Sequence, residues 1–391
     1  MEEWKEYQLK DVTTILGDGL HGTPEYDDNG TVFFINGNNL VNGKIEIKDS
    51  TKRVSKDEAN KYKKNLTERT ILVSINGTIG NVAKYKGEAC ILGKSACYFN
   101  VADNFDLNFI YYVVASQQFK DSMTRLATGT TIKNVSLETM RNYSFPAPSI
   151  NEQKRISAVL SSLDSKIELN RRINDNLEQQ AQALFDYYFS ADSKYLSDSE
   201  QGVLTNIAVY LNGLAMQKFP PTDSEHSLPV LKIKELGQGK CDNNSDRCSS
   251  DIDSNYVIDN GNIIFSWSGT LMVDVWCGGK CGLNQHLFKV TPLQNYPQWF
   301  VYYWTIRHLN TFKLIAKDKA VTMGHIKRGD LENAEVIIPN KYSLVEMNAQ
   351  IEPLYQSIIN NRLEIAELET LRDALLPKLM SGELKINDLN C

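Results

Sequence analysis

No apolar run in the 391-residue sequence approaches the roughly 20 residues that a membrane-spanning helix needs. The charged residues 1–5 also lack the apolar core of a secretion signal. The seven cysteines are scattered and odd in number, which is typical of reduced thiols rather than of a disulfide framework. We therefore expect a folded protein of the cytoplasm.

Metal-binding and catalytic motifs are also lacking. Cys241 and Cys248 have six residues between them, and Cys277 and Cys281 have three, where zinc knuckles use two. The only Pro-Pro pair is followed by Thr222, not by the aromatic residue of an amino-methyltransferase loop. Residues 87–95 have five residues between their glycines, where a phosphate-binding loop has four. The sequence thus predicts no metal site and no catalytic centre.

The net charge of −6 by itself argues weakly against a nucleic-acid-binding protein. The acidity is concentrated at one end, because residues 342–391 contain 4 basic and 8 acidic side chains. Residues 1–150 contain 18 of each kind, and residues 192–341 contain 15 basic and 16 acidic ones. Two nearly neutral segments can each still present a basic face.

The most informative feature that is present is an internal repeat. Seven residues recur 191 positions later: Leu163, Ile167, Asn170, Arg171, Leu177, Ala183 and Leu184 are matched by Leu354, Ile358, Asn361, Arg362, Leu368, Ala374 and Leu375. With a shift of 192 positions, Ser74-Ile75-Asn76-Gly77-Thr78 matches Ser266-Trp267-Ser268-Gly269-Thr270. The chain is therefore predicted to contain the same structural unit twice.

Each copy is predicted to be an α/β (α+β) domain followed by a long helix. Runs rich in β-forming residues at 32–35, 71–75 and 263–267 are separated by Asn-Gly and Gly-Thr turns. One amphipathic helix is expected near residues 107–126 and again near 298–315. The expected boundaries are 1–150 and 192–341 for the two mixed domains, with helices at 151–191 and 342–391.

The two long helices carry matching heptad patterns. In the first helix, one seam position holds Leu160, Ile167, Asn174 and Ala181, and the other holds Leu163, Asn170, Leu177 and Leu184. In the second, the seam consists of Ile351, Ile358, Ile365 and Arg372 with Leu354, Asn361, Leu368 and Leu375. Two matched seams in one chain favour an antiparallel coiled coil, the alternative being two amphipathic helices that each pack on their own domain. Asn170 and Asn361 are then expected to meet near a pseudo-two-fold axis and to fix the register.

The sequence resembles the specificity (S) subunits of type I restriction-modification systems over nearly its whole length. The likeness rests on the tandem arrangement, on the Gly-Thr strand ends at 74–80 and 266–270, and on the helix entry Phe145-Pro146-Ala147-Pro148-Ser149-Ile150-Asn151-Glu152-Gln153. Residues 17–24 resemble one subclass of target-recognition domain, and residues 212–215 with 229–234 resemble another. The second helix departs from the pattern, because its entry lacks the Pro-x-x-x-Glu-Gln form.

This resemblance implies a non-catalytic subunit whose two target-recognition domains each read one half of a double-stranded DNA target. The helices would set the spacer between the halves and dock two methyltransferase subunits, which bind S-adenosylmethionine. Two motor-nuclease subunits that use ATP and Mg would be further partners, so this chain would bind no cofactor itself. The rival interpretations are a coiled-coil scaffold, a specificity module of another methyltransferase assembly, and a fused enzyme, for which we find no motif.

Sequence-specific DNA binding requires polar side chains at base edges and cations on phosphates. Residues 307–328 hold six Lys and Arg but only one acid, which is the strongest local positive field in the sequence. We expect loops 129–136 and 320–328 to face DNA, the alternative being cations that face only water. The predicted DNA-binding residues are Thr130, Thr131, Lys133, Asn134, Lys319, Thr322, His325, Lys327 and Arg328, followed by His21, Thr23, Asn36, Asn38, Gln217, Lys218, Lys232 and Lys234. Ser74 and Ser266 are as consistent with a structural role at the strand end as with a contact to DNA.

Overall fold

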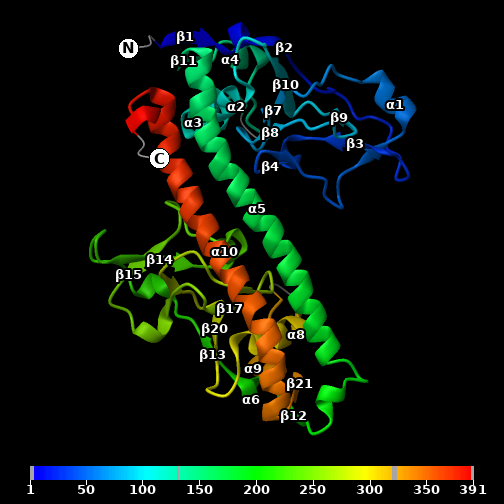
Figure 1. Cartoon of the computed structure of the whole chain (residues 1–391), viewed down its shortest axis with the longest axis vertical. Helices are drawn as coiled ribbons and strands as arrows, with labels where there is room; N and C mark the ends of the chain where they lie inside the picture. Colours follow the sequence, from blue (N-terminus) through cyan, green and yellow to red (C-terminus); the bar gives the residue numbers. More distant parts are fainter. Residues whose placement is uncertain (1–3, 130–131, 319–323, 389–391) are drawn as a thin grey trace. The chain divides into compact units, whose positions relative to one another are not determined.

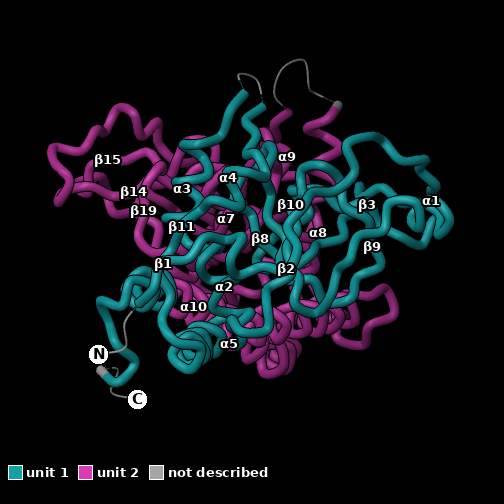
Figure 2. The backbone as a smooth tube through the Cα atoms, turned by 90° about the horizontal axis from the view of Figure 1, so that it is seen from above, with its two compact units in different colours: residues 1–165, 370–391 teal, residues 166–369 magenta. Residues whose placement is uncertain are grey.

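The computed structural model describes residues 4–129, 132–318 and 324–388, and its contacts divide the chain into two compact units. Unit 1 consists of residues 1–165 and 370–391, and unit 2 consists of residues 166–369 (Figure 2). Both units combine helices with mainly antiparallel sheets, which confirms the predicted α+β class. Domain boundaries at 150, 191 and 341 stay predictions. None of the helices in the described ranges is long and apolar enough to cross a membrane.

A four-stranded antiparallel sheet forms the centre of unit 1, in the order β2-β10-β7-β8 (Figure 1). Its strands are β2 (Thr13–Asp18), β7 (Thr70–Ser74), β8 (Val82–Lys84) and β10 (Ala96–Val101). Along β7, Ile71 and Val73 belong to one buried cluster and Leu72 belongs to another. Because successive side chains of a strand point to opposite faces, both faces of this sheet are covered, and β7 is a continuous apolar run.

One face of this sheet packs against helices, and the other packs against a smaller sheet. The helices are α2 (Leu107–Ala115), α3 (Gln117–Leu126), α4 (Leu137–Arg141), the first turns of α5 (Ile150–Tyr188) and the end of α10 (Lys341–Ser381). The smaller sheet has the order β6-β3-β9, from β3 (Val32–Ile35), β6 (Arg53–Val54) and β9 (Cys90–Leu92). Unit 1 also contains β1 (Lys5–Gln8), which pairs with β11 (Ser144–Ala147), the pair β4 (Leu40–Val41) and β5 (Lys44–Ile45), and α1 (Lys56–Lys61).

Unit 2 repeats the central sheet of this plan, as the internal repeat predicts, whereas its second sheet has one strand more than that of unit 1 and no strand pair of its described residues matches β4-β5. Its central sheet has the order β13-β20-β17-β18, from β13 (Ala208–Asn212), β17 (Ile263–Ser266), β18 (Met272–Val275) and β20 (Leu287–Pro292). The second sheet is β15-β14-β19-β16, from β14 (Ser227–Leu231), β15 (Arg247–Ser249), β16 (Val257–Ile258) and β19 (Cys281–Leu283). The remaining elements are β12 (Glu200–Val203) with β21 (Glu335–Ile338), and the helices α6 (Leu204–Ile207), α7 (Ile233–Gln238), α8 (Gln298–Asp318) and α9 (Arg328–Glu332).

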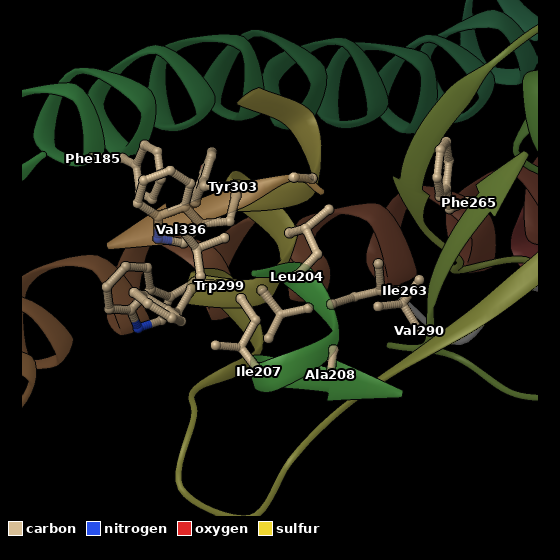
Figure 3. Close-up of a cluster of buried hydrophobic side chains, with 14 of the residues drawn as sticks. Phe185, Leu204, Ile207, Ala208, Ile263, Phe265, Val290, Trp299, Tyr303 and Val336 are labelled. Carbon is tan, nitrogen blue, oxygen red and sulfur yellow. The ribbon is translucent and has the colours of Figure 1, made fainter. Parts of the chain in front are cut away.

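The core of unit 2 is rich in large aromatic side chains. Figure 3 shows part of it, with Leu204, Ile207 and Val336 close to Trp299. Phe185 of α5 belongs to the same cluster, together with side chains of α8 and α10. Fully burying one such side chain stabilises the folded state by about 1.5–3 kcal/mol. Because side chains of α5 and α10 lie in this cluster, both long helices are part of the unit 2 core.

The amphipathic helix expected at 107–126 is interrupted, which corrects the prediction. Ser116 is extended (φ −66°, ψ 150°), and its hydroxyl accepts a hydrogen bond from the backbone N–H of Phe119 at 3.2 Å. This N-cap begins a new helix, because serine competes with the helical backbone for hydrogen bonds. Arg307 holds the equivalent position in unit 2, and there α8 is continuous over 21 residues.

Helices α5 and α10 pair in antiparallel fashion. Within unit 2, Asn170 donates to Glu364 at 2.7 Å, and Asn174, one turn further along α5, donates to the carbonyl of Ile358 at 3.1 Å. Within unit 1, Asp164 accepts from Arg372 at 3.0 Å. The partner's number on α10 therefore falls as the number on α5 rises, as the matched heptad seams predict.

The two register asparagines do not have the partners that we expected. Asn361 donates to Asn174 at 2.8 Å, whereas Asn170 bonds to Glu364. Each amide thus reaches a residue three or four positions beyond the other asparagine, so the expected Asn170–Asn361 contact is wrong by about one turn. Both amides still lie in the helix interface, and Asn170 is 1% exposed. Their hydrogen bonds satisfy polar groups that would otherwise oppose burial.

The packing of α5 can be tested with two leucines of one helix. Leu160 is 0% exposed, and Leu169 is 50% exposed. We expect Leu160→Ala to lower the free energy of unfolding by about 2–5 kcal/mol, because it leaves a cavity. Leu169→Ala should lower it by less than about 0.5 kcal/mol. Chemical denaturation followed by circular dichroism measures both, and equal losses would contradict the burial of this face.

Candidate nucleic-acid interface

In unit 1, the loop that follows α3 lies beside the end of β7. The backbones of Thr128 and Asn134 exchange two hydrogen bonds, of 2.9 and 2.7 Å, which close the loop into a hairpin. Val135 then donates to the carbonyl of Ile75 at 2.8 Å, and Gly77 donates to the carbonyl of Lys133 at 3.4 Å. The structure therefore brings together the loop and the Gly-Thr strand end. Thr130 and Thr131 lie outside the described residues.

The strand end itself is a tight turn built around a buried hydroxyl. Ser74 is 1% exposed, and its Oγ lies 3.2 Å from Oγ1 of Thr78 and 3.4 Å from the carbonyl oxygen of Asn76. Gly77 and Gly80 have φ of +74° and +85°, a region that favours glycine. In unit 2, Ser266 is 0% exposed and donates to the carbonyl of Ser268 at 3.2 Å. Both serines therefore hold the turn, which favours the structural interpretation.

A cleft of about 580 Å³ opens where the unit 1 turn meets the hairpin. It is lined by Gly77, Thr78, Ile79, Asn81, Lys120, Thr124, Ile132 and Lys133. This described lining contains two ammonium groups and two hydroxyls but no carboxylate. Such a set of donors suits an anionic group, for example a backbone phosphate.

The same frame of hydrogen bonds recurs in unit 2. Gly269 donates to the carbonyl of Gly324 at 3.0 Å, and Ile326 donates to the carbonyl of Trp267 at 3.1 Å. Ser268 and His325 form the bridge that Asn76 and Asn134 form in unit 1. His325 thus takes the place of Asn134 beside the strand end. Lys319 and Thr322 lie outside the described residues.

Two residues of the segment 307–328, which was expected to carry a positive field, have partners within the protein. The guanidinium of Arg307 lies over the rings of Trp304 and Phe185, at 5.3 and 5.8 Å from their centroids. His308 lies 2.7 Å from the carbonyl oxygen of Glu335, and burial lowers its pKa below the usual 6.5, so it is neutral at pH 7. Arg307 keeps its charge and is exposed, so it contributes to the field together with the exposed Lys313 and Lys317 of α8 and the next pair along the chain.

That pair, Lys327 and Arg328, is exposed at the start of α9. The backbone N–H of Lys327 donates to Asp330 at 2.7 Å, which fixes this turn. Nε of Arg328 lies 3.7 Å from Glu332, but its side chain is 79% exposed. An exposed pair of this kind contributes little to stability, so the guanidinium can exchange this partner for a phosphate.

Among the weaker candidates of unit 1, Asn36 contacts the frame. Its side-chain oxygen accepts from the hydroxyl of Ser95 at 2.9 Å, and the carbonyl of Ser95 accepts from Ile75 at 3.0 Å. His21 is 72% exposed and lies 2.6 Å from Asp18. Thr23 and Asn38 are also exposed. Asn36 is therefore held in place, whereas the other three present their side chains to the surface.

The weaker candidates of unit 2 divide in a similar way. Lys232, at the position equivalent to Asn36, forms an ion pair with Asp246. Lys234 is exposed, with Nζ 3.9 Å from Oε1 of the buried Glu235. Gln217 and Lys218 lie exposed in the 3-10 helix Met216–Lys218. Of the two lysines on the segment after β14, Lys232 must therefore break its ion pair with Asp246 before it can contact DNA.

A partly exposed aromatic cluster at the unit 2 strand end was not expected from the sequence. The ring of Trp267 lies 6.1 Å from that of His286 and 6.3 Å from that of His325. Its Nε1 donates to Asn212 at 2.9 Å. The signal that could have revealed it is a tryptophan in the Gly-Thr motif, where the first copy has Ile75.

The cysteines that the structure describes do not add a metal site to this interface. The six cysteines of the described ranges have free thiols. Within the same ranges, no group of three or more His, Cys, Asp or Glu side chains is arranged to hold a metal ion. The chemistry of the described interface is therefore that of hydrogen bonding, cationic and aromatic groups.

Comparison with known proteins gives consistent similarity over the whole chain. The family model described as the type I restriction modification DNA specificity domain matches residues 1–179 and 197–370. The MjaIX type I restriction enzyme specificity subunit of Methanocaldococcus jannaschii is 25% identical over 416 residues, which cover 99% of this chain and 95% of that protein. The HindI specificity subunit of Haemophilus influenzae is 22% identical, with coverage of 98% and 100%. The crystal structure of a type I S subunit from M. genitalium shares the fold, with a TM-score of 0.60, 19% identity and coverage of 97% and 96%.

Contact between the segment after β3 and the strand end can be tested at Gly37. A Cβ there would lie 2.1 Å from Oγ and 2.8 Å from Cβ of Ser74, whereas a Cβ at Gly22 would meet nothing nearer than 3.9 Å. We expect Gly37→Ala to destabilise the protein by about 1–3 kcal/mol through overpacking. Gly22→Ala should change stability little, since an open loop position tolerates the methyl group. Thermal unfolding of the two variants distinguishes them, and a neutral Gly37→Ala would contradict the contact.

Proposed function

The chain belongs to the family of type I restriction-modification DNA specificity proteins, and on that premise we propose that it reads a double-stranded DNA target in two separate halves. Unit 1 recognises one half and unit 2 recognises the other. The family is non-catalytic, so methylation and cleavage belong to partner subunits. This chain provides the sequence specificity, and the partner subunits provide the catalytic activities.

The observation that carries the proposal is the repeated hydrogen-bonded frame that joins the strand end to residues 133–135 in unit 1 and to residues 324–326 in unit 2. The two units hold this frame with equivalent backbone hydrogen bonds, from Val135 to Ile75 in unit 1 and from Ile326 to Trp267 in unit 2. At the two frames the side chains differ, with Lys133 and Asn134 in one and Gly324 and His325 in the other. A shared backbone with different polar groups is what two readers of different sequences require.

In this proposal, cationic side chains and other polar side chains have different roles in DNA binding. Lys120 and Lys133 of the unit 1 cleft and Lys327 and Arg328 of unit 2 bind phosphates and provide affinity that depends on salt. Asn134 and His325, which lie opposite Asn76 and Ser268 of the strand ends, contact base edges in this proposal. The net acidity of the chain is compatible with this, because it is concentrated in residues 342–391.

We further assign the helices a role in spacing and assembly. Helices α5 and α10 contain 39 and 41 residues, and each contributes to both units. In the proposed complex they set the unspecified spacer between the half-targets and dock two methyltransferase subunits. Those subunits bind S-adenosylmethionine, and two motor-nuclease subunits use ATP and Mg in a cytoplasmic complex. Co-purification of the chain with its methyltransferase partners tests this assembly.

Exchange of one recognition domain tests the two-reader proposal. Replacing residues 1–150 with the same region of a relative of different specificity should change one half of the methylated target and leave the other half intact. The donor must fit Ile156 and Leu160 of α5, because both are buried in the unit 1 core. Genome-wide methylation mapping provides the result. A change in both halves would contradict independent reading.

Salt dependence of binding tests the cations of unit 2. We expect the double variant Lys327→Ala/Arg328→Ala to bind its target more weakly and to reduce the slope of log affinity against log salt by about one unit per lost phosphate contact. Lys280→Ala is the control, because this exposed lysine follows β18, next to the N-terminal end of β17 and away from the strand-end turn. Titrations of a labelled duplex at several salt concentrations measure both slopes. An unchanged slope in the double variant would remove these cations from the interface.

A further inference from the structure

The two units share one backbone frame but differ sharply at one position in it. Ile75 in unit 1 is 3% exposed and belongs to the helix-facing core. Trp267 holds the equivalent position in unit 2 and is partly exposed. Each residue donates its backbone N–H to a carbonyl oxygen. The acceptor is Ser95, just before β10, in unit 1 and His286, just before β20, in unit 2. The partly exposed indole is therefore a property of unit 2 and is not needed to build the frame.

Trp267 is held rigidly by its neighbours. Its ring lies 5.8 Å from that of Phe288 with an interplanar angle of 31°, and His286 and His325 lie at 6.1 and 6.3 Å. His286 is itself positioned by Ser268, whose Oγ lies 3.0 Å from Nδ1. Ring contacts of this kind add to the fixed orientation of an aromatic side chain. The indole therefore adopts its position before any ligand arrives.

The polar atom of the indole is already used inside the protein. Nε1 donates to the side-chain oxygen of Asn212 at 2.9 Å, and an indole offers no second donor. What Trp267 can offer a ligand is therefore carbon surface. Of the other tryptophans, Trp276, Trp299 and Trp304 are at most 4% exposed, so their rings serve the core.

An apolar group beside hydrogen-bonding side chains has one natural counterpart in the major groove. The C5-methyl group of thymine is the apolar feature that distinguishes a base edge there, and it is recognised by apolar contact. His325, bridged to Ser268 beside the indole and partly exposed, carries an imidazole that can bond to a neighbouring base atom. A phosphate does not fit this surface, because the exposed indole carbons carry no positive charge.

We propose that Trp267 is a specificity-determining residue of unit 2, and that its indole contacts the 5-methyl group of a thymine in the second half-target. His286 and Asn212 are positioning residues that hold the ring in place. This inference rests on the proposed function, since it requires unit 2 to read DNA. It adds one residue that recognises a base, Trp267, and the group of the base that it contacts, the 5-methyl group of thymine.

The test uses uracil, which lacks only the 5-methyl group of thymine. The target of the wild-type complex is first mapped by methylation. Each thymine of the second half-target is then replaced in turn by deoxyuridine in a synthetic duplex. The assembled complex with its methyltransferase subunits is titrated with these duplexes. We expect one replacement to weaken wild-type binding about fourfold, the equivalent of one buried methyl group.

The matched variant is Trp267→Ile, which installs the residue that the same frame carries in unit 1. This variant should bind the thymine and uracil duplexes with equal affinity. Val209→Ala serves as the control, because this side chain is 50% exposed on the same sheet, near the start of β13. The control should retain the fourfold effect, and replacements in the first half-target should act alike on all three proteins.

A second measurement uses the wild-type complex alone and does not depend on how a variant folds. With 5-iodouracil in place of the critical thymine, irradiation should cross-link the DNA to Trp267, as identified by mass spectrometry of the tryptic peptides. A cross-link elsewhere in unit 2, or a uracil effect that persists in Trp267→Ile, would overturn the inference. Wild-type binding without any preference for the mapped target would instead overturn the proposed function.

Discussion

The structure depends on the burial of the apolar stripes of α5 and α10, because neither core is closed without both helices. In unit 1, Ile156 and Leu160 of α5 share a cluster with Leu379 of α10. In unit 2, Phe185 of α5 lies in one cluster with Ile351 of α10. Hydrophobic burial is the dominant favourable term in folding. Helix α10 is therefore a structural part of the first unit, and a compact unit here is not a continuous segment of sequence.

Polar groups inside the helix interface determine which pairing of the two stripes is adopted. A purely apolar seam would tolerate shifts by whole turns, whereas a buried amide must find its partner. Asn174 satisfies this with two bonds to α10, and Arg362 bonds to Glu178 at 2.8 Å and to Asp274 of β18 at 2.6 Å. Such partly buried pairs add little net stability, since desolvation offsets the attraction. Their contribution in unit 2 is to register, because a shift along the helix would leave a guanidinium and an amide without partners.

Much of this fold could be predicted from the sequence, because it is repeated and periodic. The offset of 191 positions predicted two copies, and the heptads predicted the antiparallel helices. Features that depend on one side chain were harder. The break at Ser116 needs the knowledge that its hydroxyl caps α3, and the partner of Asn361 depends on a shift of one turn. At the interface, the cationic segment was recognised by its charge, but charge does not indicate direction, and Arg307 stacks on Trp304 instead.

The backbone and the side chains have separate roles, which explains how one fold can recognise different DNA sequences. The frame of each unit is held by main-chain hydrogen bonds and by a buried serine, Ser74 or Ser266, so its geometry does not depend on what the neighbouring side chains are. Just before β10 and β20, the carbonyls of Ser95 and His286 accept equivalent backbone hydrogen bonds, although one residue carries a hydroxyl and the other an imidazole. A substitution at such a site changes the surface without removing a backbone bond. The backbone groups that build the frame and the side chains that face outward are thus separate, and the side chains can vary while the backbone keeps the fold.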